Sequence, residues 1–268
     1  MLQARTRKTV TVTLLVLALS GCATMSGKDG ADSGKASEYS ELYDGDMQVL
    51  HEAGQSAITA EEAVANGDRA LSLGNTDQAL FEYVHALQIS GGDAGILNKI
   101  GAIHARLGNR RLAAQAFVFS LRLDPDNAAA LEGVGLLLLQ DRRYEEASKH
   151  LNAALGKDAQ RWRSYNGLGM IADLEGDHAA AAAYYRQALD IQTGLLSRVD
   201  EARLLNNLGY SLYMSGDWEN ALFYFRTALN RNPKLERAWQ NIGLVYTRQA
   251  QYDRALDAFL QVMEKPEA

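Results

Sequence analysis

The 268-residue sequence predicts an all-α fold in which helix-turn-helix units stack into a superhelix. A glycine followed twelve residues later by an alanine occurs six times: Gly67/Ala79, Gly101/Ala113, Gly135/Ala147, Gly169/Ala181, Gly209/Ala221 and Gly243/Ala255. Successive pairs lie 34 residues apart, except for a step of 40 between the fourth and the fifth. A fixed period of this length is typical of units that cannot bury their apolar face alone. We therefore expect a protein that binds partners rather than an enzyme.

Each unit contains a small residue opposite a large one. When the repeated glycine is numbered position 8, the units begin at Ala60, Ala94, Ala128, Trp162, Ala202 and Glu236. Position 24 is always large: Tyr83, Phe117, Leu151, Tyr185, Phe225 and Phe259. A missing side chain at position 8 lets two helices approach and leaves room for that neighbour.

A turn separates the two helices of most units. Gly-Asn or Gly-Asp pairs stand at 74–75, 108–109, 176–177 and 216–217, and they predict a left-handed helix stop. Units three and six have Arg142 and Ala250 in place of that glycine.

These features resemble the tetratricopeptide repeat over residues 60–268. Unit six carries most of the family pattern in Trp239, Ile242-Gly243, Tyr246, Ala255 and Phe259. The resemblance implies an inner surface lined mainly by the first helix of each unit, at positions 2, 5, 9 and 12. It also implies a protein-binding role.

The N-terminus has the layout of a secretory signal over residues 1–21. Arg5, Arg7 and Lys8 precede the mostly apolar run 9–19, which is too short to span a bilayer. The following Leu-Ser-Gly-Cys resembles the bacterial lipobox, which implies lipidation of Cys22, the only cysteine in the chain. The alternative is a free thiol after an uncleaved anchor. Ala23, where an aspartate would imply inner-membrane retention, implies the periplasmic face of the outer membrane.

Between the lipobox and the repeats, residues 22–46 are expected to form the lipidated cysteine and a flexible tether. The segment after Cys22 is rich in Gly, Ser, Lys and Asp and poor in apolar groups. Its expected reach is about 25 to 30 Å. Residues 47–59 are expected to contain a short helix that packs on unit one, and residues 60–268 form the repeat domain.

Composition excludes several classes of function. The formal charge is −6, and removing Arg5, Arg7 and Lys8 with the signal leaves −6 − 3 = −9, which disfavours nucleic-acid binding. Membrane contact should come from the lipid. The five histidines lack metal-site spacing, and neither a nucleophile elbow nor a phosphate loop occurs. We expect no catalytic residue, metal or cofactor.

Two ladders of polar residues mark a candidate partner-binding groove in units four to six. Position 2 holds Arg163, Arg203 and Arg237, and position 5 holds Asn166, Asn206 and Gln240. Tyr210 and Tyr213 follow on the same helix face of unit five. Arginine offers a planar fork to carboxylates, and a carboxamide can bond an extended backbone. The hypothesis is that these units clamp an extended segment or a C-terminal carboxylate; the alternative is a set of ordinary solvated residues.

A second candidate surface is the C-terminal edge. Leu256, Phe259, Leu260 and Met263 recur at helical spacing in the last helix. This stripe either packs inward on unit six or docks a partner or a second copy of the chain, giving a homo-oligomer.

The extra six residues of the 40-residue step lie within 191–201. They are expected to lengthen a helix or to bulge a loop between units four and five.

Two stretches narrow the resemblance further. Units four and five contain WRSYNGLG (162–169), ADLEGDH (172–178), LLNNLGYS (204–211) and SGD (215–217). These stretches resemble the TadD lipoproteins of the tight-adherence (Flp) pilus system. That resemblance implies a pilotin-like factor that binds a secretin or other pilus-assembly proteins and supports adhesion and biofilm formation. The alternatives are a type IV pilus pilotin and an envelope adaptor that scaffolds peptidoglycan hydrolases.

Overall fold

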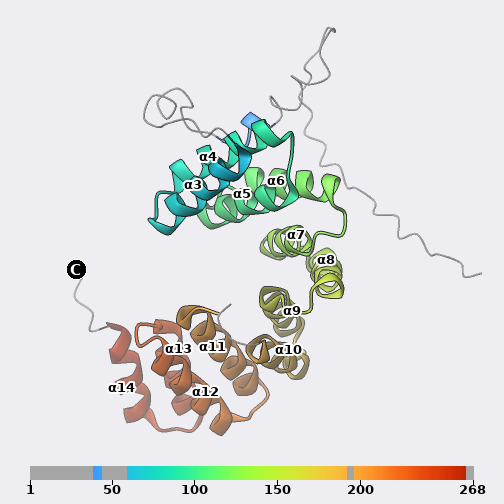
Figure 1. Cartoon of the computed structure of the whole chain (residues 1–268). Coiled ribbons are helices and arrows are strands. Elements are labelled where there is room, and N and C mark those ends of the chain that lie inside the picture. Colours follow the sequence, from blue (N-terminus) through green and yellow to red (C-terminus); the bar gives the residue numbers. More distant parts are fainter. Residues whose placement is uncertain (1–38, 44–58, 192–195, 264–268) are drawn as a thin grey trace, which may run out of the picture.

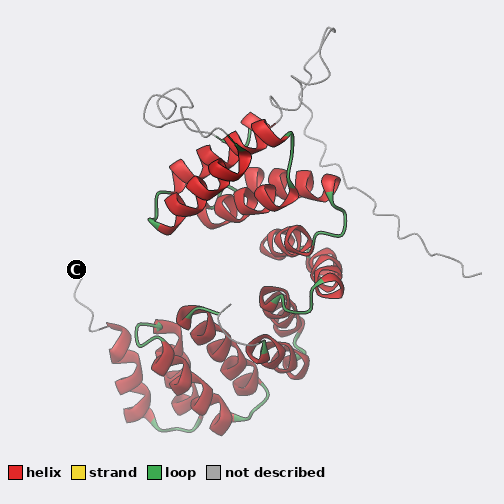
Figure 2. Ribbon diagram, in the orientation of Figure 1, coloured by secondary structure: helices red, strands yellow, loops and turns green. Residues whose placement is uncertain are grey.

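A computed structural model describes residues 39–43, 59–191 and 196–263, and within these ranges every regular element is helical (Figure 2). Twelve helices follow one short N-terminal turn: α3 (Ala60–Ser72), α4 (Thr76–Ser90), α5 (Ala94–Leu107), α6 (Arg110–Leu123), α7 (Ala128–Gln140), α8 (Tyr144–Lys157), α9 (Trp162–Glu175), α10 (His178–Asp190), α11 (Arg198–Met214), α12 (Trp218–Arg231), α13 (Glu236–Arg248) and α14 (Tyr252–Met263). The helices pair as six units, so the predicted all-α superhelix is confirmed.

The units follow one another along a C-shaped arc (Figure 1). Each helix packs against the next one in the chain, and α5, α7, α9, α11 and α13 also contact one another in series. In the middle of the arc, α7 and α9 lie on the inner side, and α8 and α10 lie on the outer side.

Packing between glycine and a large side chain holds each unit together. A β-carbon added to Gly169 would lie 2.6 Å from the Tyr185 ring, and one added to Gly209 would lie 2.8 Å from the Phe225 ring. The same approach occurs in the other four units, between position 8 and position 24. The predicted pairing of small and large residues is therefore confirmed in all six units.

The predicted left-handed stops are also confirmed. Gly74, Gly108, Gly176 and Gly216 have φ between 79° and 84°. Arg142 and Ala250 adopt the same conformation, with φ of 60° and 56°, although they carry a side chain. Such a conformation costs a non-glycine residue about 1 to 2 kcal/mol. The turn geometry therefore persists where the glycine does not.

The structure differs from the expected tether at residues 39–43. Tyr39, Leu42 and Tyr43 are buried and belong to the same apolar cluster as the helices of units one and two. Low apolar content over the whole segment concealed three residues at i, i+3 and i+4, a spacing that presents one apolar face of a helical turn. These five residues are therefore part of the folded domain.

Several expectations fall outside the described residues. These are the signal sequence, the lipidated Cys22, the tether other than 39–43, and the helix within 47–59 other than Thr59. Thr59 caps α3, because its Oγ1 accepts a hydrogen bond from the backbone nitrogen of Glu62 at 3.2 Å.

The six-residue insertion lengthens a helix, one of its two expected effects. Helix α11 has 17 residues, whereas the other helices have 12 to 15. It begins at Arg198, ahead of Ala202, where unit five was expected to start. Ser197 caps it by accepting a hydrogen bond from Asp200.

Candidate partner-binding surface

Side-chain hydrogen bonds connect the first helices of units four, five and six. Asn207 on α11 donates from Nδ2 to Oδ1 of Asn166 on α9 at 3.2 Å. Asn241 on α13 donates in the same way to Asn206 on α11 at 3.0 Å. Positions 5 and 6 therefore lie between neighbouring first helices. Positions 2, 9 and 13 lie on one helical face, since they are seven and then four residues apart, which are spacings of two turns and one turn.

The arginine ladder is open to solvent. Arg163, Arg203 and Arg237 are all exposed. Arg163 stacks over the Trp162 ring, with 4.4 Å from its guanidinium carbon to the ring centroid. Arg203, whose side chain is 66% exposed, lies 3.7 Å from the Asp200 carboxylate, an i, i+3 pair that contributes little to stability. Both guanidinium groups therefore remain accessible to a partner.

The carboxamide ladder differs from its predicted role. Asn206 is only 6% exposed, and its Oδ1 accepts the hydrogen bond from Asn241. Asn166 is half-buried and bonds Asn207, whereas Gln240 is exposed. A buried carboxamide satisfies its partners inside the array because an unpaired one is costly. Asn206 therefore joins units rather than presenting its side chain to a partner.

The two tyrosines lie side by side on α11. Their ring centroids are 6.3 Å apart with an angle of 42° between the planes. Tyr210 is 37% exposed, and the Tyr213 hydroxyl accepts a hydrogen bond from Nε of Arg248 on α13 at 3.2 Å. Tyr210 thus offers its ring to solvent, and Tyr213 connects units five and six.

An apolar row beside the arginines was missed in the sequence. At position 9, Met170, Tyr210 and Leu244 are 38%, 37% and 41% exposed. At position 13, Leu174 and Met214 are also exposed. The signal was present, because position 9 holds a large apolar residue only from unit three onward. We call these five residues and the three arginines the inner-face row.

The C-terminal edge is divided in its exposure. Phe259 is half-buried, and its ring lies 2.4 Å from where a β-carbon on Gly243 would stand. Leu260 is half-buried and Leu256 is 58% exposed, while the side chain of Met263 is outside the described residues. Phe259 thus packs inward on unit six, and Leu256 faces solvent.

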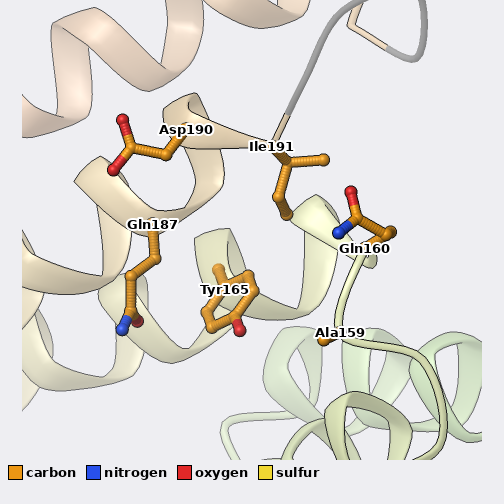
Figure 3. A pocket seen from close by; sticks show the side chains of 6 residues that line it. All are labelled: Ala159, Gln160, Tyr165, Gln187, Asp190 and Ile191. Atoms are coloured by element: carbon orange, nitrogen blue, oxygen red, sulfur yellow. The ribbon is translucent and has the colours of Figure 1, made fainter.

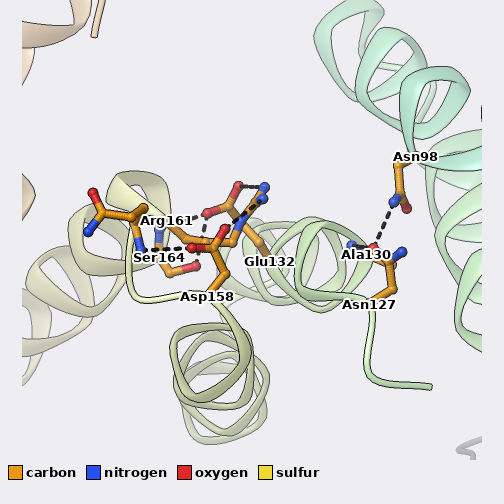
Figure 4. A network of polar contacts seen from close by, with 8 residues as sticks. Asn98, Asn127, Ala130, Glu132, Asp158, Arg161 and Ser164 are labelled. Carbon is orange, nitrogen blue, oxygen red and sulfur yellow. Dashed lines mark hydrogen bonds and ion pairs between the residues drawn. The ribbon is translucent and has the colours of Figure 1, made fainter. Parts of the chain in front are cut away.

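A buried carboxylate joins unit three to unit four (Figure 4). Glu132 on α7 has a side chain only 6% exposed, and its Oε1 accepts a hydrogen bond from Nη2 of Arg161 at 2.8 Å. Its Oε2 accepts from the backbone nitrogen and the hydroxyl of Ser164, at 3.1 and 2.9 Å. Glu132 therefore bonds the first turn of α9, whose Ser164 amide also donates to the Arg161 carbonyl oxygen at 3.0 Å, an arrangement that position 5 alone did not predict.

A second network connects units four and five around Asp173. Its carboxylate accepts hydrogen bonds from the hydroxyls of Tyr185 at 3.0 Å and Ser211 at 2.9 Å, and it lies 2.9 Å from Nδ1 of His178. Burial raises the pKa of the Tyr185 hydroxyl well above its ordinary value, and Asp173 adds to this shift. Ser211 is fully buried and its hydroxyl donates to the Asp173 carboxylate. A nucleophilic serine instead donates to a base such as histidine and is open to a substrate. The group is therefore a structural link.

A shallow pocket of about 400 Å³ lies at the end of α10 (Figure 3). Ala159, Gln160, Tyr165, Gln187, Asp190 and Ile191 line it. Its lining holds one carboxylate, that of Asp190, beside the Tyr165 phenol, and no histidine, lysine or cysteine. In the described part of the chain, no cluster of three His, Cys, Asp or Glu side chains is placed to hold a metal ion. No helix in that part is long and apolar enough to cross a membrane.

Comparison with protein families identifies the repeat. One tetratricopeptide-repeat model matches residues 163–234, and another matches 98–160 and 206–266. Together they cover more than half of the chain. The chain belongs to the tetratricopeptide-repeat family. Proteins built from tetratricopeptide repeats bind other proteins and are generally scaffolds without enzymatic activity.

Curated relatives resemble this tetratricopeptide-repeat protein over part of their length. Human tetratricopeptide repeat protein 6 is 25% identical over 57% of this chain and 28% of its own. The photosystem I assembly protein Ycf3 of Prochlorococcus marinus (strain NATL1A) is 32% identical over 31% of this chain and 47% of its own. The chain thus spans less than half the length of these relatives.

Two solved structures share the tetratricopeptide-repeat fold. That of Pseudomonas aeruginosa pilF has a TM-score of 0.63 and 21% identity, and the match covers 76% of this chain and 90% of that one. The Cut9–Hcn1 hetero-tetramer has a TM-score of 0.71 and 16% identity, with 87% of this chain and 43% of that one covered. At these identities the similarity concerns the fold alone.

Proposed function

We propose that this protein is an outer-membrane lipoprotein whose inner-face row binds a segment of a pilus-assembly protein, a secretin first among them. One observation carries the binding site. Helices α9 and α11 present the same order of exposed residues, an arginine followed seven and eleven residues later by apolar side chains. Helix α13 repeats the first two members with Arg237 and Leu244.

The inner-face row favours a particular kind of partner segment. Three guanidinium groups attract acidic side chains or a terminal carboxylate and bond them through a planar fork. The methionine, leucine and tyrosine side chains next to them offer apolar surface, and methionine adapts to different shapes. Because Asn206 is buried, the row would recognise side chains more than a bare backbone. The expected ligand is a segment that carries both apolar and acidic residues.

The proposed location rests on the N-terminal sequence. A lipid on Cys22 would hold the repeats at the periplasmic face of the outer membrane. Tethering raises the effective concentration of a partner in the same membrane, so a modest affinity is sufficient. The TadD-like stretches in units four and five favour tight-adherence pilus assembly as the process.

A crosslinked pull-down from envelope membranes tests the proposal. Replacing Arg163, Arg203 and Arg237 together with alanine should reduce recovery of the secretin at least tenfold while helicity is unchanged. The control variant replaces Arg111, Lys149 and Arg186 with alanine. This removes the same charge from exposed positions on α6, α8 and α10, the second helices of their units. It should keep native recovery.

Other outcomes of the same experiment contradict parts of the proposal. Equal recovery of the secretin by both triple variants would show that the inner-face row is not the binding site. Recovery of a type IV pilus secretin would assign the protein to type IV pilus assembly in place of the tight-adherence system. Recovery of peptidoglycan hydrolases in place of a secretin would favour the envelope adaptor. A Cys22→Ala variant that still fractionates with outer membranes would refute the lipid anchor.

A further inference from the structure

Residues 39–43 form one helical turn that packs on the outer side of units one and two (Figure 1). The turn is closed by hydrogen bonds from the backbone nitrogen of Leu42 to the Tyr39 oxygen at 3.0 Å and from Tyr43 to Ser40 at 3.2 Å. Tyr39 and Tyr43 are less than 10% exposed, and Leu42 is fully buried. Five residues thus bury three large side chains against the repeats.

Aromatic contacts position the two ends of the turn. The Tyr39 ring meets the Phe119 ring of α6 edge to face, with centroids 6.0 Å apart. The Tyr43 ring meets Phe81 of α4 in the same manner at 6.2 Å. Such edge-to-face pairs are favourable beyond the area that they bury. The turn therefore bridges the second helices of two consecutive units.

Polar contacts fix the centre of the turn. The fully buried His104 on α5 is 2.8 Å from the Leu42 carbonyl oxygen through Nε2, which donates to that oxygen. Asn109 approaches the other ring nitrogen at 3.5 Å as a donor, which agrees with this tautomer. Gln115 on α6 donates to the Glu41 carboxylate at 3.2 Å. A buried histidine thus donates a hydrogen bond to a backbone oxygen of the turn.

The site exists at one place in the array. Only units one and two combine an aromatic ring at position 22, Phe81, with histidine at position 11 and an aromatic ring at position 26 of the next unit. Unit five also has an aromatic ring at position 22, Phe223, but that ring is 60% exposed whereas Phe81 is 6% exposed. Position 22 is therefore a surface position that residues 39–43 cover in unit one.

We infer that the outer face of α4, α5 and α6 is a recognition site for a helical turn of the form Tyr-x-x-Leu-Tyr, and that residues 39–43 of the same chain are its ligand. The site is separate from the inner-face row and does not depend on the proposed pilus partner. Because residues 39–43 dock on α4, α5 and α6, they do not cover the inner-face row on α9, α11 and α13.

A peptide in trans tests the site. In the full chain, Tyr39, Leu42 and Tyr43 are replaced together by serine, which removes the internal ligand and leaves its site. A fluorescent peptide of residues 36–46 should bind this variant saturably, as measured by anisotropy, and should bind the native chain at least tenfold more weakly. Adding Phe81→Ala to the variant, which removes the ring that Tyr43 meets, should abolish binding, whereas adding Phe223→Ala, the change at the same position of unit five, should not.

The opposite results are equally clear. Binding to neither protein, or equal binding to both, would overturn the inference. A native chain that forms a dimer dependent on Leu42 would overturn the assignment of the ligand to the same chain. If the serine variant loses helicity, the milder Leu42→Ala variant serves instead, and it should still bind the peptide more tightly than the native chain does.

Discussion

Removing Arg161 should destabilise the junction between units three and four. The Glu132 side chain is 6% exposed and the Arg161 side chain is 24% exposed, and the two are joined at 2.8 Å. Removing one partner of a fully buried pair costs about 3 to 5 kcal/mol because it leaves a charge without compensation. Two hydrogen bonds from Ser164 remain, and Arg161 is partly solvated, so about 2 kcal/mol is expected for Arg161→Met.

A double-mutant cycle isolates the interaction. Glu132→Gln removes the charge and keeps an oxygen that can accept from Ser164. The double variant Glu132→Gln/Arg161→Met should therefore be more stable than the two single effects together predict, by about 1 to 2 kcal/mol. Urea unfolding followed by circular dichroism gives the free energies. Since repeat arrays need not unfold in one step, hydrogen exchange at the Ser164 amide supplies a local readout.

The control uses an exposed ion pair of similar length. Lys149 and Glu145 on α8 are 2.6 Å apart, but both side chains are more than two-thirds exposed. Lys149→Met should therefore cost no more than about 0.5 kcal/mol. Additive effects in the Glu132 cycle, or exchange at Ser164 as slow in Arg161→Met as in the native chain, would refute the reasoning.

Two further predictions concern backbone positions. Gly209→Ala should destabilise the protein by about 1 to 3 kcal/mol, because its β-carbon would lie 2.8 Å from the buried Phe225 ring. Gly156→Ala in α8, where nothing lies within 4 Å of the new β-carbon, should stabilise it by about 0.5 kcal/mol. Shifts of the urea unfolding midpoint in the same direction for both variants would contradict this. Ala250→Gly should raise the melting temperature, because it relieves a positive φ of 56° by about 1 kcal/mol; a lower melting temperature would show that the left-handed conformation carries no strain there.

The repeat pattern was sufficient to predict the fold because each unit repeats the same local rule. The spacing of Gly209 and Phe225 specifies how two helices touch, and the glycine after each first helix specifies where it ends. Arg142 and Ala250 show the strength of this rule, since packing on both sides imposes the turn even where the residue opposes it. Residues 39–43 escaped prediction because their three apolar side chains are embedded in a polar segment, and their partners lie 38 to 80 residues away.

The candidate site was predicted less completely because a sequence does not distinguish contacts within the array from contacts with a partner. Glu132 and Asn206 both occupy position 5, where the family pattern implies an inner-surface residue. In the structure both are buried: Glu132 is bonded by Arg161 and by Ser164 of the next unit, and Asn206 is bonded by Asn241 of the next unit. The arginines at position 2 also occupy a position that the family pattern places on the inner surface, but their side chains are exposed.

Hydrogen bonds within the array engage the buried side chains at position 5, and they limit which side chains a partner can contact. A partner that lies along α9, α11 and α13 meets guanidinium groups and apolar side chains, while the carboxamide of Asn206 is already engaged. Replacing a buried, bonded asparagine would loosen the packing between units five and six, so lost binding in an Asn206 variant would not identify a contact. Exposed positions such as Arg203 and Leu244 can be changed without that effect. The side chains that a partner can reach are therefore those that the neighbouring units leave unused.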